Sequence, residues 1–553
     1  MLSSFFKNKF EGLNLVVPCL VAAVVATRVY YTSTFVDSST HPAKAKKDDT
    51  IVQKRVRYLP SKIPLLGNAI EMLLHSDRFH DWIAEHLVPC HGKPFMLRLP
   101  GKDDMMFIAT PEHIEQVLKT QFENFPKSRN IHDVFFDLLG DGIVVTNNET
   151  WKRQRRVLVN LFSARALRER MTPIVHKHLV SFRRIVENAA SCEKSIDMFE
   201  LMHRYTLDVI AEIGFGTQLK ALEGENEAFA EALSRAQYIA SARFKQPNVW
   251  WKMKRLLNIG SEKKMRHAIN VIDEHVMKII SSAMERHQER KESTAAVRSM
   301  DKDIISIILD SMEHKNEVVD LVEIRDIATA ALIAGRDTTA DALAWFFYVL
   351  SQHPSVEAKL RTELIAHLPK LSSDPEYMPS ADDLNKIHYL EATIRELLRL
   401  VPPGPVISSI HCIRDTVFPD GTFVPNNTDI IISVYSTGRL GNLWGEDALE
   451  FNPERFLDDE TGEVLKLPSS KFCAFSAGPR ICVGQSLAYL EMKTIIAQVI
   501  SRYHLVLEPG QKPAYSQGIT LGMQKPLIMR VESIDALDSC VETCSEKSSS
   551  SDE

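Results

Sequence analysis

The ten residues from Phe475 to Gly484 constrain this chain more than any other segment. They place Cys482 in a loop with glycines at 478 and 484 and with Arg480 two positions before the cysteine. Glycines permit tight turns and close backbone approach to a flat ligand. A thiolate that ligates haem iron is a strong donor and favours cleavage of a bound O–O bond. The alternative is a free cysteine buried in a Gly/Pro loop.

The residues around the cysteine fit a haem ligand. Arg480 offers a permanent cation to a haem propionate, and Phe475 can shield the sulfur. The run 485–492 has a helical pattern, so the thiolate would lie near the positive N-terminal end of a helix. The loop therefore predicts a haem-thiolate site.

This loop resembles the haem-thiolate loop of the cytochrome P-450 family, and the resemblance extends over roughly residues 50 to 535. It implies haem b with Cys482 as the axial iron ligand, and Gly478 as a cofactor-binding residue of the same loop. Trp151 and Arg155, four residues apart, match the pair that contacts a haem propionate in the family.

A second signature links two distant segments. Glu396 and Arg399 are three residues apart, so on a helix they share a face and can bond each other. Arg455 lies in a Phe-Asn-Pro-Glu-Arg-Phe segment that resembles the one completing this cluster in the family. As isolated features, these residues would be solvated surface. The resemblance implies a buried structural scaffold behind the haem.

The fold class implied by the resemblance is mainly α with small β-sheets. Length alone would suggest roughly three or four domains, but no linker or repeat divides residues 60–530. Helical periodicity dominates, with extended pieces near 95–109 and 405–435. We expect a membrane anchor over 1–31, a linker over 32–58, one catalytic domain over 59–534, and a disordered acidic, serine-rich tail over 535–553.

The N-terminal region contains a charge-free apolar run from residue 12 to residue 27. It is shorter than the ~20 residues of a usual spanning helix, but flanking residues can extend it. A cleaved signal peptide is the alternative. Basic residues are denser after the run, which places the downstream domain in the cytosol. We therefore expect a retained single-pass anchor, and the resemblance to the family's microsomal members implies the endoplasmic reticulum membrane.

Composition excludes several other classes of protein. The net charge of −6 argues against a nucleic-acid partner. The eight cysteines form no CxxC or Cys/His zinc pattern, so neither zinc nor a disulfide framework is indicated. No Gly-x-Gly-x-x-Gly opens a βαβ unit, so the chain does not bind NADPH itself. Any electrons that its reaction needs would therefore come from a separate reductase.

The oxygen chemistry is expected in a long helical run from about 318 to 350. An Arg-Asp pair inside an apolar helix is costly to bury without a purpose, and Gly335 weakens the helix. The alternative is helix packing at 334–335 with an ion pair at 336–337. The resemblance implies that Ala334 and Gly335 make room for dioxygen, Thr338 is the hydrogen-bonding alcohol and Asp337 passes protons inward. The predicted activity is monooxygenation.

The resemblance also implies partners. Membrane-bound members of the family take electrons from NADPH through a FAD/FMN-containing NADPH-cytochrome P-450 reductase, and cytochrome b5 is a further candidate donor. Residues 151–156 form a basic patch that could face an acidic reductase surface. An ordinary solvated helix face is the alternative.

The substrate is predicted from several segments that resemble fatty-acid and alkane ω-hydroxylases of plants and fungi, among them 135–143 and 435–439. Such an enzyme needs a long apolar channel and a cation near its mouth. Sterols, terpenoids or xenobiotics are the alternative substrates, and a non-catalytic haem carrier or sensor is a third possibility. The predicted channel residues, each also explicable as plain core, are Phe135, Phe136, Ile143, Val406, Ile407 and Leu521.

Two departures from the family pattern limit this interpretation. Ala334 stands where animal fatty-acid hydroxylases often carry a glutamate that esterifies the haem, so we expect haem without that covalent bond. The segment 407–411 carries only His411 where many relatives have an arginine or lysine that contacts a propionate. That propionate therefore lacks an obvious partner.

Overall fold

A computed structural model describes residues 53–534, apart from residues 62, 64–65, 293–302, 315–318 and 517. Contacts divide the chain into Met1–Val52 and Gln53–Glu553. The predicted anchor, most of the linker and the predicted tail lie outside the described residues. No helix within the described ranges has both the length and the apolar character needed to cross a membrane.

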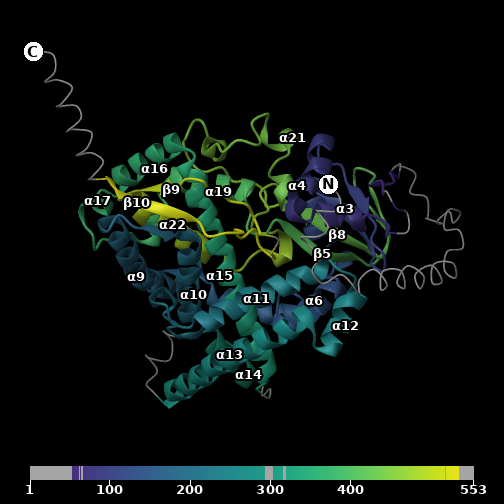
Figure 1. Ribbon diagram of the computed structural model, residues 1–553, viewed down its shortest axis with the longest axis horizontal. Helices are drawn as coiled ribbons and strands as arrows, with labels where there is room; N and C mark the ends of the chain where they lie inside the picture. The colour runs from purple at the N-terminus through teal and green to yellow at the C-terminus, as the bar shows by residue number, and fades with distance from the viewer. Residues whose placement is uncertain are drawn as a thin grey trace, which may run out of the picture. The chain divides into compact units, whose positions relative to one another are not determined.

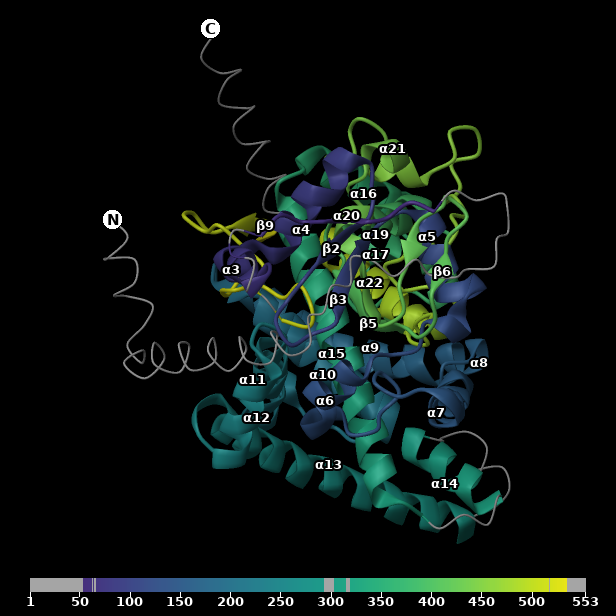
Figure 2. The ribbon, with the colours of Figure 1, turned by 90° about the vertical axis from the view of Figure 1, so that its right-hand side faces the viewer.

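Helices make up most of the described chain, as the sequence predicts, and Figures 1 and 2 show their arrangement. Their bounds are α3 (Ala69–Leu74), α4 (Phe79–Leu87), α5 (Pro111–Glu115), α6 (Arg129–Leu139), α7 (Asn148–Leu161), α8 (Ala164–Ala166), α9 (Thr172–Ser191), α10 (Met198–Phe215), α11 (Glu227–Phe244), α12 (Asn248–Leu257), α13 (Gly260–Glu292), α14 (Ile304–His314), α15 (Leu321–Ser351), α16 (Pro354–His367), α17 (Lys370–Ser373), α18 (Ala381–Leu384), α19 (His388–Leu400), α20 (Val434–Thr437), α21 (Gly441–Trp444) and α22 (Gln485–Ile500).

Strands form three small sheets. The largest has the order β1 (Arg57–Tyr58), β2 (Phe95–Leu97), β3 (Asp104–Ile108), β8 (Thr428–Ser433) and β5 (Val406–Cys412). A second has the order β4 (Ser195–Asp197), β10 (Ile528–Ser533) and β9 (Tyr503–Leu507), and β6 (Thr416–Val417) pairs with β7 (Phe423–Val424). The extended pieces predicted near 95–109 and 405–435 are therefore confirmed. They meet in the largest sheet, where β3 pairs with β8 in parallel.

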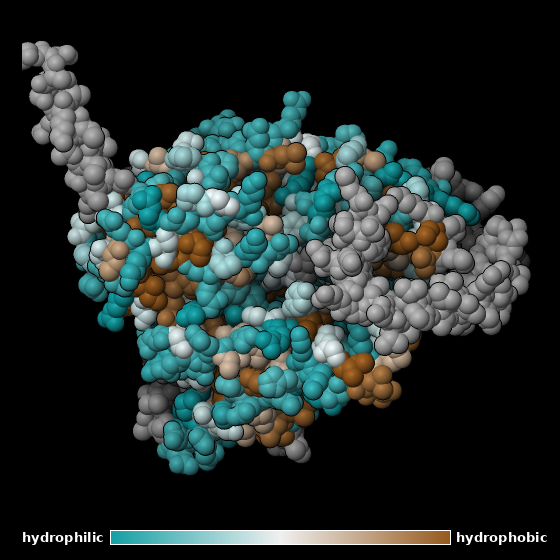
Figure 3. Space-filling model, in the orientation of Figure 1, coloured by the Kyte–Doolittle hydropathy of each residue, from teal (hydrophilic) through white to brown (hydrophobic). Residues whose placement is uncertain are grey.

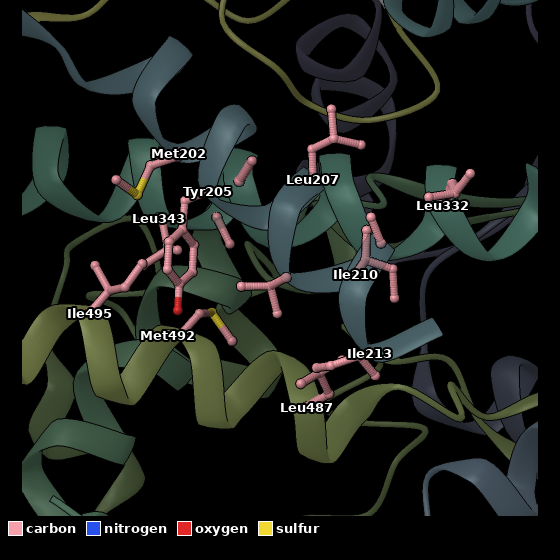
Figure 4. Packing of buried hydrophobic residues seen from close by; sticks show 14 of the residues in the cluster. Met202, Tyr205, Leu207, Ile210, Ile213, Leu332, Leu343, Leu487, Met492 and Ile495 are labelled. Carbon is pink, nitrogen blue, oxygen red and sulfur yellow. The ribbon is translucent and has the colours of Figure 1, made fainter. Parts of the chain in front are cut away.

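The core is centred on α10, α15 and α22. Helix α10 is capped at its N-terminus by Asp197, whose carboxylate accepts hydrogen bonds from the amides of Phe199 and Glu200, and at its C-terminus by Gly216 with φ +62°. Such a cap stabilises a helix by about 1 kcal/mol. Figure 4 shows how the three helices pack, through Met202, Tyr205, Leu207, Ile210 and Ile213 of α10, Leu332 and Leu343 of α15, and Leu487, Met492 and Ile495 of α22.

The glycine of α15 explains how closely two of these helices approach. A Cβ atom at Gly335 would lie 2.6 Å from the side chain of Ile210. Because heavy atoms cannot come that close, any larger residue would push α10 away from α15. The structure therefore shows the close helix packing that was the alternative interpretation of Gly335. That Gly335 also makes room for dioxygen stays a prediction.

Candidate functional site

The cysteine loop is held in a shape that its glycine requires. A short 3-10 turn spans Gly478–Arg480, and the backbone amide of Cys482 donates to the carbonyl of Phe475 at 2.9 Å. Gly478 has φ +66°, and a Cβ atom there would lie 2.0 Å from the backbone oxygen of Leu118. Only glycine fits such a position. The loop therefore presents Cys482 in one defined orientation.

The sulfur of Cys482 lies at the start of α22, as expected. Burial raises the pKa of its thiol, while the backbone amides of Gly484 and Gln485 and the cation of Arg155 act to lower it. The side chain nonetheless has an exposed surface. A thiol that is desolvated by the surrounding protein and still accessible is one that faces an internal space. A metal ion in that space would deprotonate the thiol.

Helix α15 shows the same kind of exposure at its centre. Ala334 is exposed and Thr338 is half-exposed, whereas most of their neighbours on the helix are buried. The hydroxyl of Thr338 donates to the carbonyl of Ala334 at 2.9 Å, so the two residues share one side of the helix. This side of α15 is therefore accessible at Ala334 and Thr338 and is not packed there against a neighbouring helix of the described chain. Alanine at 334 offers no carboxylate for an ester bond.

Three cations gather beside the cysteine loop. Arg480 donates to the carbonyl of Thr146 and to Oδ1 of Asn147, both at 2.9 Å, and its guanidinium lies 4.4 Å from the ring centre of Trp151. Arg155 donates to the carbonyl of Ile481 at 2.9 Å. Burial, together with Arg155, lowers the pKa of Arg480 to about 10. The structure thus brings together all the residues predicted for propionate binding.

Lys127 is the third cation, and sequence reasoning missed it. Its ammonium group donates to the carbonyl of Ser408 at 3.2 Å, and its backbone amide donates to Oδ1 of Asn147 at 2.9 Å. Asn147 therefore joins Lys127 to Arg480. Burial, with a contribution from Arg480, lowers the pKa of Lys127 to about 8. The contact with Ser408 places this lysine beside the segment 407–411 in which the family's cation is missing.

The charges of Lys127, Arg155 and Arg480 indicate whether this site fits a haem. No ion pair joins Lys127, Arg155 or Arg480 to a carboxylate among the described residues. Buried charges are normally paired, so three partly buried cations without a carboxylate partner suit an anionic ligand. Two propionates beside an accessible thiol supply that charge. The residues fit a thiolate-ligated haem.

His411 does not supply the missing cation. Its Nδ1 lies 2.9 Å from Oδ1 of Asp429 and 4.0 Å from Oδ2 of Asp103. The hydrogen bond to Asp429 raises the pKa of His411, so the charge of the imidazole is balanced by neighbouring carboxylates. No signal in the sequence indicated that Lys127 takes the place of the missing cation. Its contact with Ser408 depends on a β-bridge between Lys127 and Ile410, which are far apart in the sequence.

We expect Lys127→Met to weaken haem retention about tenfold or more, because a hydrogen bond to a charged group contributes roughly 1.5–3 kcal/mol. The measurement is the rate of haem transfer from the purified protein to an excess of a haem scavenger. Lys102→Met is the matched control, since Lys102 is a second lysine whose pKa is lowered by burial and which donates to a backbone carbonyl, that of Phe244. Equal transfer rates in both variants would contradict the assignment of Lys127.

Asp337 lies toward α10, away from the side of α15 that carries Thr338. Its Oδ1 is 3.1 Å from the guanidinium of Arg336 and 3.6 Å from Nε2 of His203. The residue is 6 % exposed, and no hydrogen bond from a described residue reaches its Oδ2. Asp337 would have to reach Thr338 through water or by rotating its side chain.

The predicted scaffold is assembled and buried. Two nitrogens of Arg399 bind the two carboxylate oxygens of Glu396 at 2.7 Å each, and Nε of Arg455 lies 3.4 Å from the same carboxylate. Arg399 also donates to the carbonyls of Ala448 and Glu450, at 2.6 and 3.0 Å. The cluster therefore ties α19 to the segment 448–455.

The predicted channel residues are not all placed alike. Phe135 and Leu521 are buried, Ile143, Val406 and Ile407 are partly buried, and Phe136 is 44 % exposed. Phe136 lines a surface hollow of ≈ 580 Å³ together with His132, Asp133, Trp251, Lys252, Arg255, Leu256 and Arg266. Two cations lie in the same segments as these residues: His132 pairs with Asp141 at 2.9 Å, and Lys525 is exposed.

The basic patch at 151–156 is less available than its sequence suggests. Lys152 pairs with Glu149 at 2.9 Å, and Arg153 pairs with Glu323 at 2.6 Å. Arg155 is directed inward to the cysteine loop, as described above. Two of the four cations are thus already neutralised by the chain's own carboxylates, which weakens the case for a docking surface here.

Comparison with known proteins gives a consistent result. The family model described as Cytochrome P450 matches residues 58–529. Cytochrome P450 704B1 of Arabidopsis thaliana is 34% identical over 502 residues, which cover 85% of this chain and 94% of that protein. Cytochrome P450 86B1 of the same plant is 32% identical over 467 residues (82% and 81%). Cytochrome P450 94A1 of Vicia sativa is 32% identical over 466 residues (82% and 87%).

Proposed function

The chain belongs to the cytochrome P450 family, and we propose that it hydroxylates long-chain fatty acids or alkanes near the chain terminus, with electrons from NADPH delivered by a separate reductase. The predicted family is confirmed, and with it the monooxygenase class and the haem-thiolate cofactor. One observation carries the enzyme class: an accessible, desolvated Cys482 thiol beside three cations that have no carboxylate partner.

Different residues would bind the haem and deliver protons. Cys482 would hold the haem iron through its thiolate, and the bound haem would supply the activation of dioxygen for insertion of one oxygen atom into a C–H bond. Lys127, Arg155 and Arg480 would hold its propionates. Thr338 offers a hydroxyl on the accessible side of α15, and Asp337 is the carboxyl group that would pass protons toward it from the α10 side of the helix.

A fatty-acid substrate is supported by the hollow beside Phe136. Its lining combines apolar Phe136, Trp251 and Leu256 with three permanent cations and one acid. Lys252 pairs with Asp133 and Arg255 with Asp137, at 2.6 and 2.7 Å, whereas no described carboxylate forms an ion pair with Arg266. Arg266 is therefore the cation best placed to attract a carboxylate head group.

Membrane association is supported by α12 and the residues that follow it. Val249 is 76 % exposed and Leu256 is 84 % exposed, and Leu257 and Ile259 are also exposed. Figure 3 shows hydrophobic side chains gathered at the place where Figure 1 labels α12. Lys254 lies on the same helix and forms no ion pair with a described residue, whereas Lys252 and Arg255 pair with acids. An exposed apolar face with adjacent cations suits the interface of an anionic bilayer, where a lipid substrate would enter.

The test is product analysis by mass spectrometry, with a flavoprotein reductase, NADPH and a saturated fatty-acid series. We expect terminally hydroxylated acids, and we expect Arg266→Gln to raise KM about tenfold with little change in kcat, as the loss of one binding contact does. Lys263→Gln, one turn earlier on α13, is the matched control. A normal reduced carbon-monoxide spectrum without any acid product would overturn the fatty-acid proposal and favour a ring-shaped substrate.

We further expect Thr338→Ala to uncouple turnover. NADPH would still be consumed, but hydrogen peroxide would replace most of the alcohol, because the hydroxyl that directs protons on the accessible side of α15 is lost. General acid–base contributions are on the order of 10²-fold or more. The ratio of product to NADPH consumed is the measurement. Thr339→Ala, at the neighbouring buried threonine, should leave this ratio near the wild-type value.

A further inference from the structure

Two turns of α15 and one residue of α10 form a buried cluster of four ionisable groups. They are Arg336, Asp337 and Asp341 of α15 and His203 of α10, each 7 % exposed or less. Nε2 of His203 lies between the carboxylates, 3.6 Å from Asp337 and 3.4 Å from Asp341. Arg336 pairs with Asp337 at 3.1 Å and donates to Ser234 of α11 at 3.0 Å.

The hydrogen bonds of His203 show which protonation state the cluster needs. Its Nδ1 donates to the carbonyl of Phe199 at 2.9 Å, because a carbonyl oxygen can only accept. Nε2 then faces two carboxylates, which attract a proton on that nitrogen as well. An imidazolium results, and the cluster contains two cations and two anions. Alternation of charge is what makes so many buried ions tolerable.

Asp341 makes the cluster dependent on His203. It is 1 % exposed, and neither carboxylate oxygen receives a hydrogen bond from a described residue. The segment before β10 approaches it through Gly522, where a Cβ atom would lie 3.1 Å from Oδ1. His203 is therefore the cation that balances Asp341, while Arg336 balances Asp337.

We propose that protonated His203 is a positioning residue for proton delivery, holding Asp337 on the α10 side of the helix and keeping Asp341 ionised, so that one proton is shared between the two carboxylates whenever His203 is neutral. This proposal deepens the role given to Asp337 and rests on the monooxygenase function. It assigns to His203 the control of how readily Asp337 takes up a proton and passes it to the side of α15 that carries Thr338.

The geometry implies a pH dependence with a definite sign. Burial lowers the pKa of His203, but Asp341, with help from Asp337, outweighs burial and Arg336, and the net effect raises the pKa above 6.5. A raised pKa means that the stabilising charge is fully present below pH 6.5 and is lost as the pH rises through the folded-state value. Coupling of NADPH consumption to product should therefore fall on the alkaline side.

The experiment compares wild type with His203→Gln and His203→Lys in the haem-loaded, full-length protein, across a pH range of about 6 to 9. Gln removes the charge, so the alkaline limb in the coupling ratio should disappear and coupling should be low at every pH, by about tenfold. Lys keeps the charge to high pH, so it should restore coupling where wild type has lost it. His178→Gln is the matched control, because His178 is a second buried histidine paired with a carboxylate, Glu212 at 2.7 Å.

A second readout separates this proposal from the proposed substrate. The difference in thermal midpoint between wild type and His203→Gln should shrink as the pH rises, with no substrate present. A pH-independent difference would overturn the imidazolium, whatever the enzyme oxidises. Wild type that makes no acid product but shows the expected pH-dependent midpoint would overturn only the fatty-acid substrate. Equal pH profiles of coupling in wild type and the Gln variant, measured with any substrate that is turned over, would overturn the positioning role.

Discussion

Replacing Cys482 by serine is expected to abolish both the thiolate spectrum and product formation. A serine hydroxyl stays protonated at neutral pH and is a weaker, harder donor, so it cannot replace a thiolate on haem iron. The amides of Gly484 and Gln485 would still point at the site, but they would act on a neutral group. The measurements are the reduced carbon-monoxide spectrum and product yield per protein.

Cys473→Ser provides the matched control for this change. Cys473 lies nine positions earlier in the same segment and is buried, and burial raises the pKa of its thiol to about 12. Its thiol lies within reach of the Thr437 side chain, which a serine hydroxyl can also bond. We expect an unchanged spectrum in this variant. A thiolate spectrum that persists in Cys482→Ser would move the ligand to another cysteine.

The second large effect is expected at the buried scaffold. Arg399→Leu would leave the carboxylate of Glu396 fully buried with its two 2.7 Å partners gone, and would leave the carbonyls of Ala448 and Glu450 without their donor. Removing one partner of a buried ion pair costs about 3–5 kcal/mol, a large fraction of the stability of a typical domain. We expect little folded, haem-containing protein from cells.

The matched control is a pair of the same charge type on the surface beside the cluster. Lys359 and Glu454 pair at 2.6 Å but are 53 % and 49 % exposed, so Lys359→Ala should cost about 1 kcal/mol or less. Haem content of the purified protein and the thermal midpoint measure both variants. If Arg399→Leu retains haem and stability like the control, the cluster is not the structural scaffold that its burial indicates.

Much of the fold and of the haem site could be predicted from the sequence because their signals are local. The turn around Gly478, the helix after Gly484 and the i, i+3 pair of Glu396 and Arg399 each depend on a few neighbouring residues. The long apolar run around Gly335 likewise predicts the helix that the structure contains.

The parts that sequence reasoning missed depend on contacts between distant segments. Lys127 meets Ser408 only because two loops pair far apart in sequence, and His203 meets Asp341 only because α10 crosses α15. Neither residue carries a motif of its own. The burial of Phe135 next to the exposed Phe136 shows the same limit, since adjacent phenylalanines on one helix face different surroundings.

The pairing of β3 with β8 has a consequence for how the protein is made. Asp104 pairs with Thr428, so roughly 320 residues separate the two partners. At the usual rate of translation, about 5–20 residues per second, some tens of seconds pass between the synthesis of β3 and the synthesis of β8. Unpaired strand edges attract other chains during such an interval. The largest sheet can therefore close only near the end of translation, and nascent chains that stop before residue 428 should be clients of chaperones.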